Sequence, residues 1–269
     1  METNLINTLI KLEPIFREAG DIAYKMQKHA KQSNKFDTGN ELVDIVTDAD
    51  LEVQEFLLKK MAKTALVDCR LLAEENTPST RRFNPKGKVY LGIDPIDATS
   101  IYSRGGKFFN LVVSLHDGKD FLYTFKHFPA LKWTHRIVHN KYTVYGRTPS
   151  FNLPPQAKTS IPFLIPWNPE KIIPKLYKGL VANGYNFVVY TDLTNDYGTT
   201  EMLICKQIAG RYVENPNAYD GLVSLHFAQA KKLKIYTGGP KGKLDLTIIK
   251  KRKIGFYYPG YFLVLNKRA

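Results

Sequence analysis

Apolar positions recur with two different periods along the first half of the chain. A spacing of three and four residues predicts a helix over residues 4–28. A second helix is predicted to begin at Thr47-Asp48-Ala49-Asp50, where Thr47 and Asp50 have the spacing of a capping box. Short apolar or alternating runs predict strands over 43–46, 66–73, 89–93, 108–116, 121–125, 133–139 and 142–145.

The second half alternates helices with strands. Six prolines between residues 148 and 169 predict a junction between an N-terminal α+β domain, 1–150, and a C-terminal α/β domain, 151–269. Helices are predicted over 170–182, 199–209 and 220–230, and strands over 187–190, 211–214, 233–236, 254–258 and 262–265. This alternation favours the α/β fold class, with helices layered on sheets.

Composition narrows the class of protein. The 269 residues are 43% hydrophobic, which is enough for a large core, and no apolar run approaches the ~20 residues of a membrane span. Charged residues interrupt the apolar N-terminus, so we expect no signal peptide there. Two cysteines, Cys69 and Cys205, form no metal or redox motif and suit a reducing, cytoplasmic compartment. The net charge of +14 suits phosphate-bearing partners, although a solvated basic surface explains it more simply.

The hexapeptide Asp94-Pro95-Ile96-Asp97-Ala98-Thr99 is the centre of the candidate chemistry. It follows the strand predicted over 89–93, and we expect Pro95 to end that strand because proline has no N–H for the ladder. Two carboxylates three residues apart and a nearby hydroxyl are able to hold hard cations. Alone, the segment is more typical of a turn followed by a helix cap.

Further acids occupy comparable places in the chain. Asp50, Glu74 and Asp220 each lie at the end of a predicted strand or the start of a predicted helix. If these carboxylates converge, oxygen ligands without clustered Cys or His favour Mg²⁺ over zinc. The six histidines show no ligand spacing, and we interpret them as surface or packed residues.

Together these segments resemble the inositol monophosphatase family of lithium-sensitive, magnesium-dependent phosphomonoesterases. The resemblance rests on the central hexapeptide, Glu74-Glu75, Tyr219-Asp220 and the acid-bearing entry to the second helix that ends at Asp50. It implies a layered α-β-α-β-α sandwich of the sugar-phosphatase type, a Mg²⁺ cofactor, a small phosphorylated substrate and a homodimer.

The resemblance also implies residue roles. A first magnesium ion would be held by Glu74, Asp94 and the Ile96 carbonyl. A second would be held by Asp94, Asp97 and Asp220. A third, more weakly bound ion would have Glu74 as its ligand. Catalysis would use Thr99, hydrogen-bonded to Asp50, with Glu74 beside them, to orient and deprotonate the attacking water. The substrate contacts implied are Asp97, Ala98, Thr99, Gly198, Thr199, Thr200, Glu214 and Asp220, with the backbone N–H groups of Ala98 and Thr99 on the phosphate.

The chain departs from the family pattern at several positions. Ala98 replaces the usual glycine, and its Cβ is harmless there only if φ is negative. Tyr219 replaces tryptophan, residues 221–224 lack the usual pair of small residues, and Glu214 is one residue nearer to Asp220 than in inositol-specific members. A surface strand-end acid is an equal interpretation of Glu214.

Three classes of function follow. The first is Mg²⁺-dependent hydrolysis of an inositol monophosphate-like or 3′-phosphoadenosine 5′-phosphate-like monoester. The second is a catalytically weak relative that acts as a binding or scaffold protein, suggested by Ala98 and residues 221–224. The third is a nucleic-acid binder, suggested by charge alone and disfavoured because no aromatic and basic motif of a known module is present. We expect neither membrane association nor specific nucleic-acid binding.

Overall fold

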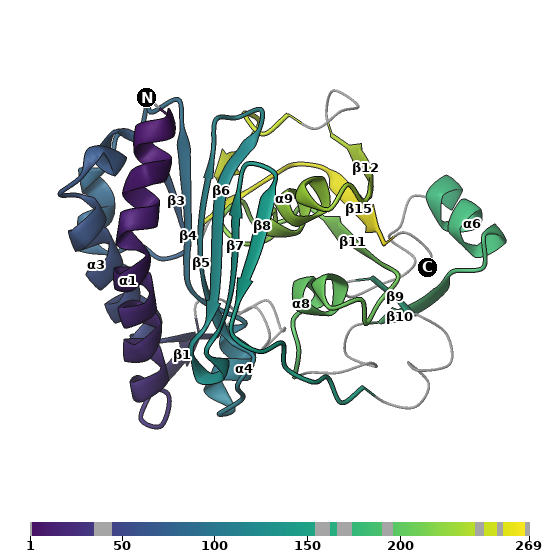
Figure 1. The fold of residues 1–269 in the computed structure, drawn as a ribbon, viewed down its shortest axis with the longest axis horizontal. Coiled ribbons are helices and arrows are strands. Elements are labelled where there is room, and N and C mark those ends of the chain that lie inside the picture. The colour runs from purple at the N-terminus through teal and green to yellow at the C-terminus, as the bar shows by residue number, and fades with distance from the viewer. Residues whose placement is uncertain are drawn as a thin grey trace.

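The computed structural model describes residues 2–34, 45–153, 162–165, 174–189, 196–239, 245–251 and 255–266. Its elements form alternating layers of helix and sheet (Figure 1). Among the helices in these ranges, none combines the length and the apolar character that crossing a bilayer requires.

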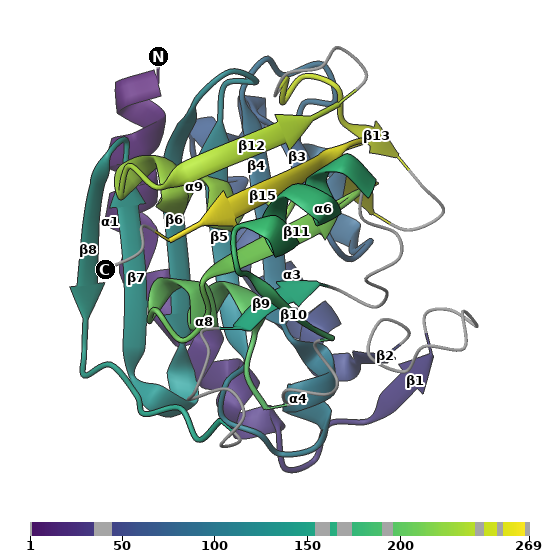
Figure 2. The ribbon, with the colours of Figure 1, turned by 90° about the vertical axis from the view of Figure 1, so that its right-hand side faces the viewer.

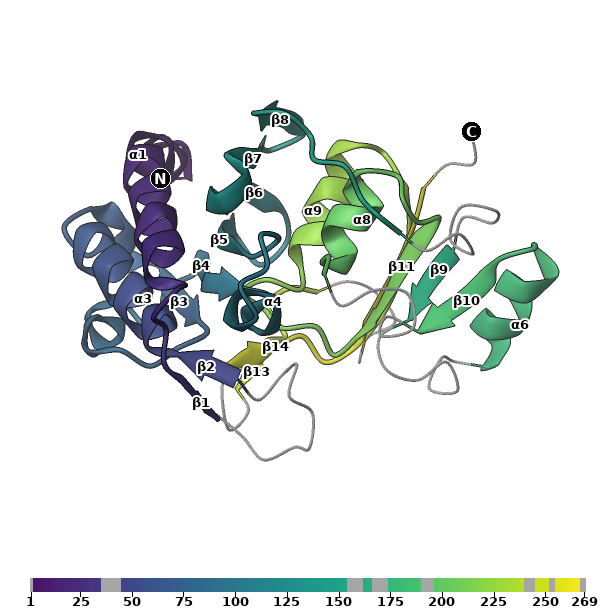
Figure 3. The same cartoon turned by 90° about the horizontal axis from the view of Figure 1, so that it is seen from below.

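The first sheet has six strands in the order β3-β4-β5-β6-β7-β8. Strands β3 and β4 are parallel, and every later neighbour is antiparallel. Helices α1 (Glu2–Met26) and α3 (Asp48–Met61) cover its outer face (Figure 3). The strands span Arg70–Ala73, Tyr90–Asp97, Asn110–His116, Phe121–Phe128, Trp133–Val138 and Lys141–Tyr145.

The second sheet has the order β10-β9-β11-β15-β12. Strand β9 spans Pro162–Ile165, β10 spans Asn186–Val189 and β11 spans Gly210–Glu214. Strand β12 spans Lys234–Gly238, and β15 spans Tyr261–Leu265. Helices α8 (Thr199–Ile204) and α9 (Val223–Ala230) lie between the two sheets, and α6 (Pro174–Ala182) lies outside the second (Figure 3). The predicted α-β-α-β-α layering is therefore confirmed.

Short elements complete the fold. Helix α4 (Thr99–Ser103) follows β4 directly. Two small antiparallel pairs join β1 (Gln32–Asn34) to β2 (Ile45–Thr47) and β13 (Lys250–Lys251) to β14 (Phe256–Tyr257), and Figure 2 shows both at the edge of the molecule. Three 3₁₀ turns span Ala65–Asp68, Pro78–Arg82 and Pro129–Leu131.

Among the described residues, two large apolar cores hold the layers together, beside a smaller one that contains Leu180 and Leu263. One lies between α1, α3 and the first sheet and contains Phe16, Leu57 and Phe125. The other joins residues of both chain halves, with Phe121 from the first sheet and Phe262 from the second in the same cluster. Apolar burial therefore crosses the boundary predicted at residue 150, and the division into two domains stays a prediction.

Several predicted elements have different bounds in the structure. The first part of the strand predicted over 66–73 is a 3₁₀ turn, because the Thr64 side chain accepts a hydrogen bond from the Leu66 N–H and starts a turn. The helix predicted to residue 209 ends at Ile204, and Lys206 has a φ of 57°.

The proline-rich segment contains a strand that sequence patterning missed. Strand β9 begins at Pro162, where a missing N–H costs least, and it pairs with β10 and β11. Parts of four predicted elements, at residues 43–44, 170–173, 190 and 254, lie outside the described residues.

Candidate active site

Asp94 and Asp97 lie on the same face of β4 because the strand contains a bulge. Side chains three positions apart in a regular strand point to opposite faces. Asp94, however, pairs with Val112 of β5, and Asp97 pairs with Asn110. An advance of three residues along β4 therefore matches an advance of two residues along β5, so β4 contains one extra residue, which is a β-bulge. The prediction that Pro95 ends the strand is therefore wrong. Proline is tolerated because bulges interrupt the hydrogen-bond ladder.

Asp220 reaches the same place from the second half of the chain. It lies in the turn before α9, where Val223 N donates to the Asp220 carbonyl at 3.0 Å. The helix predicted from residue 220 thus begins at Val223. The Tyr219 backbone crosses over Gly92 of β4, and a Cβ on Gly92 would collide with Ser114 Oγ and would also meet Tyr219 Cα and O at 3.3 Å. Glycine at position 92 therefore allows the close approach that brings Asp220 to β4.

The carboxylates of Asp94, Asp97 and Asp220 converge. One oxygen from each lies within 4.8 Å of the others. Burial raises the pKa of Asp94 well above its usual value, and the negative charges of Glu74, Asp97 and Asp220 raise it further. Burial, with Asp97 and Glu74, raises the pKa of Asp220 to about 7. A divalent cation relieves such repulsion, so the donor set fits Mg²⁺.

Glu74 and Ile96 lie beside these three acids. The Glu74 N–H donates to the Ile93 carbonyl at 3.1 Å, which extends the β3–β4 ladder by one residue. The Glu74 carboxyl hydrogen-bonds Asp94. The Ile96 carbonyl accepts the Thr99 hydroxyl at 3.0 Å. Both groups named as ligands by the sequence resemblance are therefore near Asp94.

Asp50 and Thr99 form a second polar pair. Asp50 is fully buried at the start of α3, where its Oδ2 accepts hydrogen bonds from Thr47 N at 2.8 Å and Thr47 Oγ1 at 2.6 Å. Its Oδ1 lies 3.5 Å from the Thr99 hydroxyl oxygen, whose single proton has a nearer acceptor in the Ile96 carbonyl. The capping box is confirmed, and the expected contact between Asp50 and Thr99 is present at the long limit of a hydrogen bond.

Asp97 also has partners that the sequence did not predict. Its Oδ2 lies 2.8 Å from Lys126 Nζ and accepts Asn110 Nδ2 at 3.0 Å. Lys126 Nζ in turn lies 2.6 Å from Glu201 Oε1. Burial opposes ionisation of Asp97, but Lys126 and Asn110 outweigh it, so the pKa of Asp97 is lowered. Lys126 lies in β6, which is buried along its length, but the strand predicted over 121–125 ended before it.

Residues 8–139 match the sequence model of the inositol monophosphatase family, a span that contains Glu74, Asp94, Asp97 and Thr99. The N-terminal half of the chain therefore matches the inositol monophosphatase family. A match to a phosphatase family supports a phosphatase activity for the chain.

Solved structures of this family share the fold. A staphylococcal IMPase-I complexed with products has a TM-score of 0.65 at 16% identity, over 98% of this chain and 91% of that one. An IMPase from Thermotoga maritima has a TM-score of 0.64 at 16% identity, over 97% and 91%. An IMPase/NADP phosphatase complexed with Mg²⁺ and phosphate has a TM-score of 0.63 at 16% identity, over 98% and 91%. No curated protein sequence matches the chain.

The family's expected phosphate contact has an unusual backbone here. Ala98 caps α4 with φ 69° and ψ 48°, the left-handed region. The condition under which alanine would be harmless, a negative φ, is therefore not met. The Ala98 Cβ costs energy in this conformation and is an added group at the start of α4.

The residues expected near the leaving alcohol divide into two groups. Gly198, Thr199 and Thr200 precede Glu201, whose carboxylate lies against Gly198 and reaches Lys126, so this turn is close to the cluster. Glu214 is exposed at the end of β11. Among the described contacts, none joins Glu214 to the cluster.

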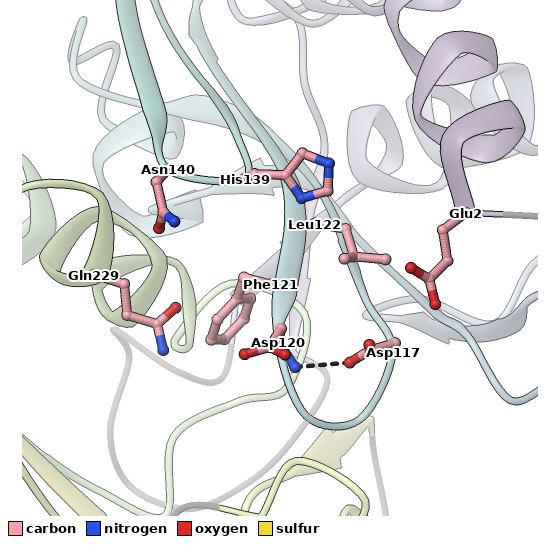
Figure 4. A pocket seen from close by; sticks show the side chains of 8 residues that line it. All are labelled: Glu2, Asp117, Asp120, Phe121, Leu122, His139, Asn140 and Gln229. Atoms are coloured by element: carbon pink, nitrogen blue, oxygen red, sulfur yellow. Dashed lines mark hydrogen bonds between the residues drawn. The ribbon is translucent and has the colours of Figure 1, made fainter.

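A pocket of about 520 Å³ lies elsewhere on the first sheet (Figure 4). It surrounds the hairpin between β5 and β6, where Asp120 N donates to Asp117 Oδ1 at 2.7 Å. The hairpin is at the opposite end of β5 from Asn110, roughly 20 Å along a strand of this length. Its lining contains none of the converging carboxylates.

Proposed function

We propose that the chain hydrolyses a small phosphate monoester with Mg²⁺ as cofactor. The convergence of Asp94, Asp97 and Asp220 oxygens within 4.8 Å supports this proposal most directly. The donors are carboxylates from two halves of the chain, and their mutual repulsion without a cation is a cost that a purely structural cluster does not need.

Glu74, Asp94, Asp97, Asp220 and the Ile96 carbonyl would hold Mg²⁺. Bound Mg²⁺ would supply Lewis-acid polarisation of the phosphoryl group and a lowered pKa for a water molecule. The carboxylates would hold the cation against β4, and their own negative charge has to be offset by cations before a phosphate can approach.

Thr99 and Asp50 would orient the attacking water, with Glu74 beside them. The Thr99 hydroxyl lies 3.5 Å from Asp50 Oδ1, and Asp50 is anchored by two hydrogen bonds from Thr47. This anchoring holds the Asp50 carboxylate in place beside Thr99. The first N–H groups of α4, at Ala98 and Thr99, would bind phosphate because the first N–H groups of a helix have no partner within it.

The substrate would be inositol monophosphate-like or 3′-phosphoadenosine 5′-phosphate-like. The net charge of +14 suits a substrate with several negative charges. One structural neighbour was solved with D-inositol-1-phosphate and another with NADP and Ca²⁺. An inositol phosphate and a phosphorylated nucleotide are therefore both reasonable substrates to test. Gly198, Thr199 and Thr200 would contact the leaving alcohol. Glu214 would lie farther from the carboxylates, at the outer end of the substrate site. The homodimer and the cytoplasmic location stay predictions.

A catalytically weak relative that binds phosphorylated ligands is the second candidate. Two observations favour it, the Cβ of Ala98 at the start of α4 and the ammonium of Lys126 on Asp97. Both would lower turnover without removing the carboxylates that bind a cation.

Phosphate release tests the two candidates. Purified protein is incubated with Mg²⁺ and inositol monophosphates, fructose 1,6-bisphosphate or 3′-phosphoadenosine 5′-phosphate. We expect release on at least one substrate, abolition by EDTA, and a loss of about 100-fold or more in Asp94→Asn. Because ionising the buried Asp94 is unfavourable, Asp94→Asn should keep the wild-type unfolding temperature.

The exposed Asp68→Asn is the matched control, since it makes the same chemical change away from the cluster. It should keep full activity. If the wild type releases no phosphate from any substrate but still binds them, the weak relative is correct and the phosphatase proposal is wrong.

A further inference from the structure

Lys126 lies inside the carboxylate cluster rather than at its rim. Its side chain is 3% exposed, and its ammonium is within 3 Å of both Asp97 Oδ2 and Glu201 Oε1, at 2.8 and 2.6 Å. In the sheet ladder Lys126 pairs with Val112, which pairs with Asp94, so Lys126 and Asp94 lie on one face of the sheet. The lysine therefore shares that face with the proposed metal ligands.

A second basic side chain approaches the carboxylates from the second sheet. Arg211 is on β11 of the second sheet, and its Nη1 donates to Ser224 Oγ at 2.6 Å. It interacts electrostatically with Asp220, Glu201 and Asp97. The carboxylates are thus flanked by a fixed positive charge from each sheet.

The charge balance of the cluster differs from that of a purely acidic metal site. Two basic groups, Lys126 and Arg211, face five acids: Glu74, Asp94, Asp97, Glu201 and Asp220. With all seven ionised, three negative charges remain. One divalent ion leaves a single negative charge, whereas two make the cluster positive before any substrate arrives. The Asp97 Oδ2 is moreover already engaged by an ammonium and an amide.

We propose that Lys126 is a built-in cation that takes the place of one divalent ion on the Asp97 side of the cluster. The inference rests on the proposed function, because it concerns the same carboxylates. Lys126 is a positioning residue here. It holds Asp97 and, through Glu201, the first turn of α8, and it lowers the number or the affinity of divalent ions that the acids bind.

Divalent-ion binding to the full chain tests this inference without any activity assay. Mn²⁺ is titrated into metal-free protein, and bound and free Mn²⁺ are counted by electron paramagnetic resonance and calorimetry. Lys126→Met alone leaves Glu201 buried without its partner and is at risk of unfolding. The informative comparison is therefore the double variant, Lys126→Met with Glu201→Gln, against Glu201→Gln alone.

The double variant should bind one more Mn²⁺ per chain than Glu201→Gln, or bind its weakest Mn²⁺ about tenfold more tightly, because a charge adjacent to Asp97 has been removed. Lys126→Arg, which keeps the charge, should retain the wild-type number of ions. Lys59→Met removes an exposed lysine on α3 and controls for net charge.

Equal number and affinity in the double variant and in Glu201→Gln would overturn the inference while leaving a metal-dependent phosphatase intact. Absence of Mn²⁺ binding in every protein would overturn both the inference and the proposed cofactor. Mn²⁺ binding that appears only when Lys126 is replaced would support the inference but overturn the proposed cofactor, because the wild type would then bind no divalent ion.

Discussion

At the scale of the residue, Ala98 shows what a single Cβ costs at the start of α4. Its φ of 69° is in the region that glycine occupies freely and that alanine occupies at a cost of about 1–2 kcal/mol. The neighbouring residues hold it there, because Asp97 is paired to Asn110 on one side and α4 begins on the other.

Ala98→Gly should therefore stabilise the protein by about 0.5–1 kcal/mol, since the relief of strain exceeds the added flexibility of the unfolded chain. Urea unfolding measures the difference. If the Cβ also obstructs phosphate, KM for the substrate should fall in the same variant.

Ala19→Gly in the middle of α1 is the control, because the same replacement inside a helix should destabilise the protein by about 1 kcal/mol. An Ala98→Gly variant that is less stable than the wild type would show that the backbone at residue 98 is not strained.

At the scale of elements, α9 is attached to the first sheet by a buried histidine. His226 Nε2 donates to the His139 carbonyl at 2.7 Å, and its Nδ1 accepts the Thr124 hydroxyl at 2.8 Å. The ring also stacks on Phe121. This arrangement uses the neutral imidazole, and burial lowers the pKa of His226 to about 4. The contact fixes the helix that follows Asp220.

This histidine predicts a loss of stability in acid. A base whose pKa is lowered by folding stabilises the native state above its unfolded pKa of about 6.5, and this stabilisation is lost as the pH falls toward 4. One such group contributes about 2 kcal/mol to the difference between pH 7 and pH 5. Urea unfolding of His226→Gln should show a smaller difference between these two pH values than the wild type does.

The exposed His29→Gln is the matched variant for this comparison. Since burial also lowers the pKa of His116, His127 and His135, some acid sensitivity should persist in His226→Gln. An unchanged difference between pH 7 and pH 5 would mean that His226 is protonated in the native state as easily as in the unfolded one.

Elements and site differ in how far the sequence predicts them. Helix α1 and strands β5 to β8 follow from local periodicity, and their bounds agree with the structure to within a few residues. The bulge in β4 does not follow from local pattern, because proline is equally compatible with the end of a strand and with an interruption of its ladder.

At the scale of the whole molecule, the site exists only when two sheets are stacked. Asp94 and Asp97 come from the first sheet, whereas Asp220 and Arg211 come from the second half of the chain. Gly92 allows the two to approach, and Phe121 and Phe262 share the core between them. The acids were predictable as candidates because each lies at the end of an element.

The partners of these acids were not predictable in the same way. Lys126 reaches Asp97 across two strand pairings, and it reaches Glu201 only because α8 lies between the sheets. Neither contact has a sequence spacing that identifies it. Stacking of the layers decides which strand residue meets which helix residue, and a single sequence carries no local signal for that.

The central claim is that Asp94, Asp97 and Asp220 bind a divalent cation together. Crystals of the protein grown with Mn²⁺ and phosphate, measured at the manganese absorption edge, test it most directly. The account predicts an anomalous difference peak between the oxygens of these three residues, with the peak lost in Asp94→Asn. A map with no anomalous peak among these oxygens, from crystals that bind Mn²⁺ elsewhere, would contradict it.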